Sequence, residues 1–415
     1  MKSKNKINKK IIFIVLTLAT GMIYKLPYIQ DVFYVPIQKS LNLTHTQLGN
    51  ILSIAGIFST FGFLASIYFI DKISKRILIP CALIGIGITG IYLSTLPGYY
   101  ALILIWILFA LFSDMLYWPV VVKSVKDLGS DNEQGRIFGF FEAGRGLFDT
   151  IIVFIGIVIF SIFDSLKCVI LFYSVVSIII GIIAFIVLGK DEPKTMNNES
   201  KLSVPLEVIK SKEVLLISGN IFCAYAIYCG ITYMMPFLQN TYGVSVLLIG
   251  VFGMINQYGI KMLAGPIGGY IADKKFKSTS KYFAFCFISI IVSTLLMIIL
   301  SDKEFSVVVG FIFVVIFSIL VNSMKALLFA PMQEVGIDKE ISGGAISLAS
   351  FIGYSPLIFC YSLYGSILDK FDGLLGYRIL FSIIIGFGIM GLLINKKLRY
   401  LISKNEKLRN IKKAS

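Results

Sequence analysis

Twelve long apolar runs dominate this 415-residue sequence and constrain its fold more than any other feature. Each run is long enough to cross a lipid bilayer as a helix, which takes about 20 residues. The runs cover approximately residues 10–30, 46–70, 77–96, 100–122, 134–163, 167–188, 213–238, 245–271, 280–300, 305–330, 340–368 and 374–395. Spanning β-strands would instead alternate apolar and polar residues. The sequence therefore predicts an all-α membrane protein with twelve transmembrane helices.

The longest polar segment divides these runs into two groups of six. It reads GKDEPKTMNNESKLSVPLEVIKSKE and lies between the sixth and seventh runs. We therefore predict an N-terminal six-helix bundle over residues 1–189 and a cytoplasmic linker over 190–212. A C-terminal six-helix bundle over 213–395 and a basic cytoplasmic tail over 396–415 complete the predicted organisation.

The basic residues indicate the orientation of the helices. The net charge of +15 comes mostly from short segments between the apolar runs, which favours a membrane topology signal over binding to nucleic acid. With both termini in the cytoplasm, the external loops carry only Lys39, Lys167, Lys303 and Lys370. This bias predicts a multi-pass protein of the cytoplasmic (inner) membrane with both termini inside.

A charged motif occurs in the loop after the second run and again after the eighth. Both loops resemble the signature Gly-x-x-x-Asp-Arg/Lys-x-Gly-Arg/Lys-Arg/Lys of the major facilitator superfamily. The first copy departs from it at Ile67 and Ser74, and the second at Phe276 and Ser278. The matching residues are Asp71, Lys72, Lys75 and Arg76 in the first copy, and Gly269, Asp273, Lys274 and Lys277 in the second.

The resemblance covers essentially the whole chain and implies a fold of two pseudo-symmetric six-helix bundles. Transporters of this family rock the two bundles around a central site. The resemblance implies that charge pairs in the two loops break and reform during transport. We expect Asp71 and Asp273 to take part, because acidic residues there oppose the cytoplasmic bias toward basic ones.

Seven charged residues fall inside the predicted spans, away from the ends of each span. Each costs at least roughly 2–3 kcal/mol at the centre of a membrane, so such residues are functional candidates by default. They are Lys25, Asp114, Glu142, Arg145, Asp149, Lys261 and Lys325. Their summed charge of +1 favours an anionic ligand.

Three of these residues lie on one stripe of the fifth predicted helix. Glu142, Arg145 and Asp149 are spaced by three and four residues, so Arg145 can pair with a carboxylate on either side. One alternative is a self-neutralising structural pair with one spare acid. The other is that a carboxylate takes up protons as its surroundings change, so we assign coupling and gating to these three residues and Asp114.

A narrower resemblance runs from Trp118 to Gly146. Its Trp-Pro pair, the acidic-x-Gly-Arg element formed by Glu133 and Arg136, and the Gly-rich helix after it resemble the organophosphate and organic-anion branch of the superfamily. In that branch an arginine of the first helix binds the substrate anion, and Lys25 stands at the comparable position. The branch often has a second arginine in helix 7, where this chain has Tyr228. The resemblance therefore implies a carboxylate or another singly charged anion rather than a phosphate ester.

The remaining candidates for substrate binding lie on other presumed cavity helices. Lys261 is about 18 Å from the cytoplasmic end of its helix, judged from the 12 residues that separate it from Asp273. Lys325 and Asp114 occupy nearly equivalent places in the two halves and could pair. The predicted substrate-binding set is Lys25, Lys261, Lys325, Tyr228, Gln257 and Trp118.

These features predict a secondary transporter of a small organic anion, coupled to protons or to a counter-substrate. The sequence contains no nucleotide-binding loop, metal cluster or catalytic triad, so we expect neither an enzyme nor a cofactor. The expected partners are the substrate, protons or a counter-substrate, and the lipid bilayer, and nothing requires more than a monomer. An exporter of cationic or amphiphilic compounds and a transporter-like nutrient sensor remain alternatives.

Overall fold

A computed structural model of the chain describes residues 9–66, 73–128, 134–188, 211–300, 307–336 and 339–414. Within these ranges the regular elements are helices, and no strand occurs. The chain folds into two compact units, Met1–Asn198 with Val246–Gly259, and Glu199–Ser245 with Ile260–Ser415. The all-α fold class predicted from the apolar runs is confirmed.

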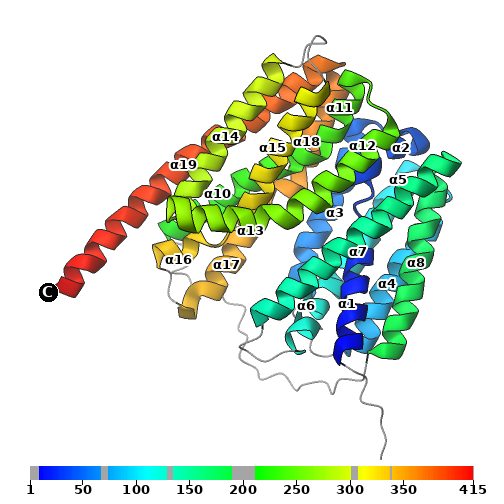
Figure 1. Cartoon of the computed structure of the whole chain (residues 1–415), viewed down its shortest axis with the longest axis horizontal. Helices are drawn as coiled ribbons and strands as arrows, with labels where there is room; N and C mark the ends of the chain where they lie inside the picture. The colour runs from blue at the N-terminus through cyan, green and yellow to red at the C-terminus, as the bar shows by residue number, and fades with distance from the viewer. Residues whose placement is uncertain are drawn as a thin grey trace, which may run out of the picture. The chain divides into compact units, whose positions relative to one another are not determined.

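The first unit contains the helices of the N-terminal half. Its elements are α1 (Lys9–Ile23), α2 (Gln30–Leu41), α3 (His45–Ser66), α4 (Lys75–Leu93), α5 (Tyr99–Ala110), the π-helical turn η1 (Leu111–Tyr117), α6 (Trp118–Lys126), α7 (Gln134–Phe163) and α8 (Leu166–Val187). It also includes α12 (Val246–Met254), which packs against α2 and α7. In this unit α4 lies beside α8, and α1 packs against both α7 and α8 (Figure 1).

The second unit contains the remaining helices. Its elements are α10 (Lys212–Cys229), the 3₁₀ turn η3 (Gly230–Tyr233), α11 (Met234–Tyr242), α13 (Lys261–Ile271), the π-helical turn η5 (Ala272–Phe276), α14 (Thr279–Ile299), α15 (Val307–Ala326), α16 (Pro331–Val335), α17 (Lys339–Tyr354), α18 (Pro356–Lys370) and α19 (Leu374–Ala414). Here α19 packs against both α10 and α14, and α13 packs against α15. A further π-helical turn, η4 (Ile255–Ile260), joins α12 to α13.

These elements follow the twelve apolar runs in order. Nine helical stretches of the described residues are long and apolar enough to span a membrane, and the bent pair Val246–Gln257 with Met262–Phe276 makes a tenth. The first run corresponds to α1 and the second to α3. The part of the second run beyond Ser66 lies outside the described residues.

Two boundaries differ from those expected. The first run, predicted as one helix to residue 30, breaks after Ile23 and resumes in α2 at Gln30. Pro27 explains the break, because proline has no N–H to donate and disfavours a helical residue before it. The last helix, predicted to end near residue 395, continues to Ala414, since no proline or glycine follows Gly391.

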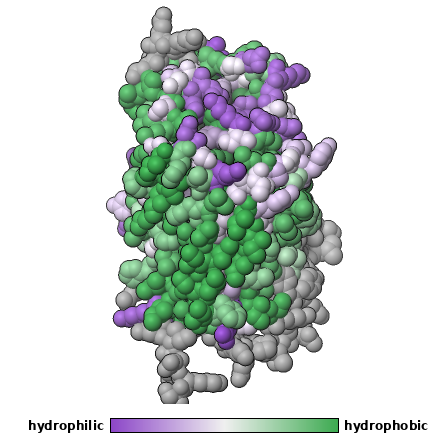
Figure 2. All heavy atoms as spheres, turned by 90° about the vertical axis from the view of Figure 1, so that its right-hand side faces the viewer, coloured by the Kyte–Doolittle hydropathy of each residue, from purple (hydrophilic) through white to green (hydrophobic). Residues whose placement is uncertain are grey.

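Apolar side chains cover the outside of the helices as expected for contact with lipid. On α8, Val175, Ile179, Ile182 and Ile186 are all exposed and recur every three or four residues, so they share one face. Figure 2 shows hydrophobic side chains gathered over a broad area of one face of the molecule. Such an area would be costly in water but is suited to a bilayer.

The close contact between α4 and α8 depends on Gly87, so a substitution at this glycine tests the packing. A Cβ atom at Gly87 would lie only 2.7 Å from the backbone oxygen of Ser174, so Gly87→Ala forces the helices apart. We expect a loss of about 1–3 kcal/mol of stability, seen as a lower thermal unfolding midpoint in detergent. The control is Gly386→Ala on α19, where a Cβ meets nothing within 4 Å. Equal midpoints for the two variants would contradict the close packing.

Candidate functional site

The break in the first span positions Lys25. The residue lies in the turn between α1 and α2, where its backbone N–H donates to the oxygen of Met22 at 3.0 Å. Lys25 is only 2% exposed. Broken helices are tolerated at membrane depth where the freed backbone lies inside the protein, and transporters commonly place ligand sites there.

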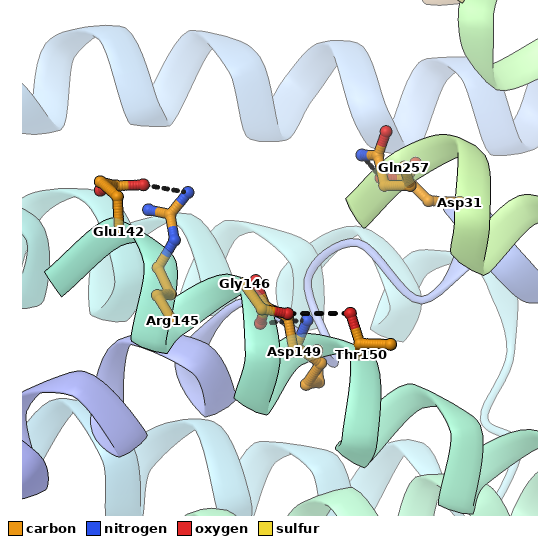
Figure 3. A network of polar contacts seen from close by, with 8 residues as sticks. Asp31, Glu142, Arg145, Gly146, Asp149, Thr150 and Gln257 are labelled. Carbon is orange, nitrogen blue, oxygen red and sulfur yellow. Dashed lines mark hydrogen bonds and ion pairs between the residues drawn. The ribbon is translucent and has the colours of Figure 1, made fainter. Parts of the chain in front are cut away.

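The ammonium of Lys25 forms an ion pair with Asp149 of α7. The Nζ–Oδ1 distance is 2.5 Å, and the two side chains are 1% and 11% exposed. Asp149 lies on α7 one turn beyond Arg145, with Thr150 next to it bonded to the oxygen of Gly146 (Figure 3). Of the two carboxylates that the spacing offered to Arg145, Asp149 is instead the partner of Lys25. A pair this deeply buried has lost its hydration, so each charge depends on the other.

Arg145 instead pairs with Glu142, the carboxylate on the other side of it in the sequence. Their Nη2–Oε2 distance is 3.1 Å, and the side chain of Glu142 is 50% exposed (Figure 3). The guanidinium also lies 5.9 Å from the ring centre of Trp118, which in turn contacts the ring of Tyr24. This pair is partly screened by solvent and is held more weakly than the pair of Lys25 and Asp149.

Asp114 lies in the π-helical turn η1, within the fourth span. It is 7% exposed and accepts a hydrogen bond of 2.5 Å from the hydroxyl of Ser59 on α3. Turns of this kind inside α-helices are frequent at functional sites. The predicted pairing of Asp114 with Lys325 stays a prediction, because the two residues belong to separate compact units.

Gln257 lies in the π-helical turn η4 and bonds to a residue that was not among the predicted site residues. Its amide Nε2 donates to Asp31 Oδ2 of α2 at 2.5 Å (Figure 3). Asp31 comes one residue after the predicted end of the first span, so it was not counted among the intramembrane charges. The apolar sequence VFYVPI that follows Asp31 indicates that apolar helix continues beyond it. Asp31 and Gln257 are both half-buried, and both belong to the first unit.

In the second unit the ammonium of Lys325 lies over the ring of Tyr228. The distance from Nζ to the ring centroid is 3.5 Å, and the ring of Tyr225 is 5.3 Å away. Tyr225 also contacts Tyr354, with 4.4 Å between the ring centroids. The structure thus brings together the predicted residues Lys325 and Tyr228. Tyr225 was missed, although it precedes Tyr228 by three residues on the same helical face.

The other predicted substrate residue of the second unit is Lys261, which is the first residue of α13. Its side chain lies outside the described part of the structure.

The first copy of the charged motif is described only in part. Asp71 and Lys72 lie outside the described residues. In the separate acidic-x-Gly-Arg element, Glu133 also lies outside them, and Arg136 is described only as part of the backbone of α7. Lys75 and Arg76 open α4, where the hydroxyl of Ser74 accepts from the backbone N–H of Arg76 at 3.3 Å. The Arg76 guanidinium donates to the oxygen of Phe185 on α8 at 3.1 Å.

The second copy of the motif forms the end of the eighth span. Gly269 lies in α13, and Asp273 and Lys274 are exposed in the π-helical turn η5. Lys277 ends this turn in the left-handed region, with φ of 51°.

Glu334 of α16, which was not among the predicted site residues, caps the helix that follows this motif. Its carboxylate accepts from the hydroxyl of Ser278 at 3.1 Å and from the backbone N–H groups of Thr279 and Ser280. A carboxylate at the N-terminus of α14 satisfies otherwise unpaired donors and suits the helix dipole.

Comparison with known proteins identifies the family. Residues 12–359 match the model of the Major Facilitator Superfamily. The chain is 43% identical over 406 residues to the inner membrane protein YihN of Escherichia coli, covering 95% of this chain and 96% of that protein. It is 27% identical to the inner membrane protein YqcE of the same organism, over 94% of each chain.

Solved structures share the fold at low sequence identity. A bacterial homologue of the human lysosomal transporter Spinster, in an inward-facing and occupied conformation, has a TM-score of 0.74 at 15% identity, covering 97% of this chain and 98% of that one. A mutant of the nucleoside transporter NupG has a TM-score of 0.75 at 12% identity, covering 95% and 100%. At such identities these structures show the fold alone. The match to the family model spans most of the chain. It shows that this protein is a membrane transporter rather than an enzyme, and that it belongs to the major facilitator superfamily.

Proposed function

We propose that the chain is a secondary transporter that moves a small organic anion across the cytoplasmic membrane by alternating access. The observation that carries this proposal is the buried ion pair of Lys25 and Asp149 at the break in the first span. A lysine that is 2% exposed can bind an anionic group in place of its internal partner. The names of the relatives, both inner membrane proteins, support the location in the cytoplasmic membrane.

The pair also suggests how transport is coupled. A substrate carboxylate that binds Lys25 competes with Asp149 for the same ammonium. This competition links substrate binding to the charge balance of the pair, which supports coupling to protons or exchange for a counter-substrate. In the second unit the ammonium of Lys325 lies over the ring of Tyr228, and this lysine is the second positive charge of the predicted substrate set that the structure describes. Lysine is a compact point charge without the two-pronged geometry of arginine, which favours a singly charged group over a phosphate ester.

A ligand screen by thermal stability tests the proposal. We expect one class of small carboxylates or other organic anions to stabilise the purified protein, by about 2.7 kcal/mol at one hundred times the dissociation constant. The screen includes sugars and cationic drugs and is run at pH 5.5 and pH 7.5. The double variant Lys25→Met/Asp149→Leu should fold and lose the stabilisation, whereas Lys281→Met, an exposed change on α14, should keep it.

Other outcomes would favour the alternatives. Stabilisation by cations only, or an anion effect that survives in the double variant, would contradict the assignment of Lys25 and favour an exporter of cationic compounds. Binding of an anion without counterflow in reconstituted vesicles would favour a nutrient sensor.

A further inference from the structure

A groove with a basic rim runs between α10 and α19 of the second unit. Its volume is about 840 Å³. Leucines of both helices form its walls, among them Leu216 of α10 and Leu393 of α19. Leu393 is 58% exposed, so this apolar surface is open to whatever surrounds the protein. A groove of this size can hold the head group and the first part of the acyl chains of one lipid.

Three lysines are among the residues that line the groove. Lys212 is the first residue of α10, and Lys396 and Lys397 lie on the neighbouring stretch of α19. No acidic residue is among those that line the described groove. The nearby Glu213 accepts a hydrogen bond from Ser211 at 3.2 Å. The rim is therefore positively charged, directly beside an apolar wall.

The groove lies near the end of each of the two helices, which places it at a membrane boundary. Lys212 begins the membrane-spanning stretch Lys212–Tyr242, and the lysines of α19 lie near the far end of the stretch Leu374–Asn405. Tyr400, also at the groove, is 70% exposed. Exposed tyrosines and lysines are typical of the level of the lipid head groups. This is the end of the helices that the charge distribution predicts to face the cytoplasm.

We propose that this groove binds an anionic glycerophospholipid of the surrounding leaflet. The lipid phosphate contacts the ammonium groups of Lys212, Lys396 and Lys397, and an acyl chain lies along the leucines. Basic pockets between transmembrane helices on this side of a membrane suit anionic head groups, and lysine binds phosphate as a point charge. The apolar wall distinguishes this ligand from a free phosphate, which would gain nothing from the leucines.

Native mass spectrometry of the purified protein, titrated with dioleoyl phosphatidylglycerol or dioleoyl phosphatidylcholine, tests the site. We expect one phosphatidylglycerol to bind more tightly than phosphatidylcholine. The variant Lys396→Gln/Lys397→Gln should weaken this binding about tenfold or more. Leu216→Trp, which fills the wall without changing the charge, should also weaken it.

The control variant Lys281→Gln/Arg399→Gln removes the same charge from exposed positions outside the groove lining. It should retain the tight site. Equal loss in the control and groove variants would mean that the lipid is held only by the general charge of the surface, and equal binding of phosphatidylcholine would exclude a site for anionic lipid. A free inorganic phosphate that displaces the lipid at millimolar concentration would also overturn the proposal.

Discussion

Asp149→Leu should destabilise the protein severely, whereas Lys25→Met/Asp149→Leu should restore stability close to that of the wild type. Removing the carboxylate alone leaves the ammonium of Lys25 buried without its partner, which typically costs about 3–5 kcal/mol. Removing both charges and replacing them with apolar groups of similar size is often neutral or stabilising. Thermal unfolding in detergent, followed by the fraction of monodisperse protein on gel filtration, measures both effects.

The double variant separates the function of the pair in transport from its effect on stability. We expect this variant to fold and to lose transport, because the proposed contact with the substrate is gone. For stability, Glu142→Gln provides the matched control, since it also removes one carboxylate of an ion pair on α7. That side chain is 50% exposed, so the cost should be below about 1 kcal/mol. A double variant that folds and still transports would show that the pair is only structural.

The helical architecture was predictable because lipid leaves the chain few alternatives. A spanning segment must satisfy its backbone hydrogen bonds internally, so a continuous apolar run such as 167–188 predicts a helix almost directly, and α8 is observed at Leu166–Val187. The break at Tyr24–Ile29 was not predicted, although Pro27 was visible. Whether a proline ends a membrane helix depends on the neighbouring helices that satisfy the freed groups, and the sequence does not specify those neighbours.

The candidate site was predictable residue by residue but not as pairs. Lys25 and Asp149 were each predicted as site residues because a charge inside an apolar run is energetically costly. Their pairing depends on how α1 and α7 are rotated against each other. Arg145, only four residues from Asp149, was an equally good partner by spacing, yet it bonds to Glu142. Asp31 was missed for a different reason, since it lies just outside the predicted span.

Tyr228→Ala should weaken anion binding, whereas Tyr228→Phe should preserve most of it. The ammonium of Lys325 lies 3.5 Å from the ring centroid of Tyr228, so the ring face holds the cation in place. Both side chains are half-buried, where a cation–π contact is worth about 1–2 kcal/mol, and phenylalanine retains the ring that provides it. We expect the anion concentration for half-maximal thermal stabilisation to rise about tenfold or more in Tyr228→Ala and to change little in Tyr228→Phe.

Two further variants separate the contribution of the Tyr228 ring to anion binding from the contributions of its neighbours. Tyr354→Leu removes a ring that contacts Tyr225, the more distant of the two rings beside Lys325, so its effect on anion binding should be much smaller than that of Tyr228→Ala. Lys325→Met removes the cation itself and should weaken binding at least as much as Tyr228→Ala. Combining Lys325→Met with Tyr228→Ala should add little, because the ring acts through the lysine. Additive losses in the double variant would mean that Tyr228 contacts the substrate independently, and a full loss in Tyr228→Phe would assign the role to its hydroxyl instead of its ring.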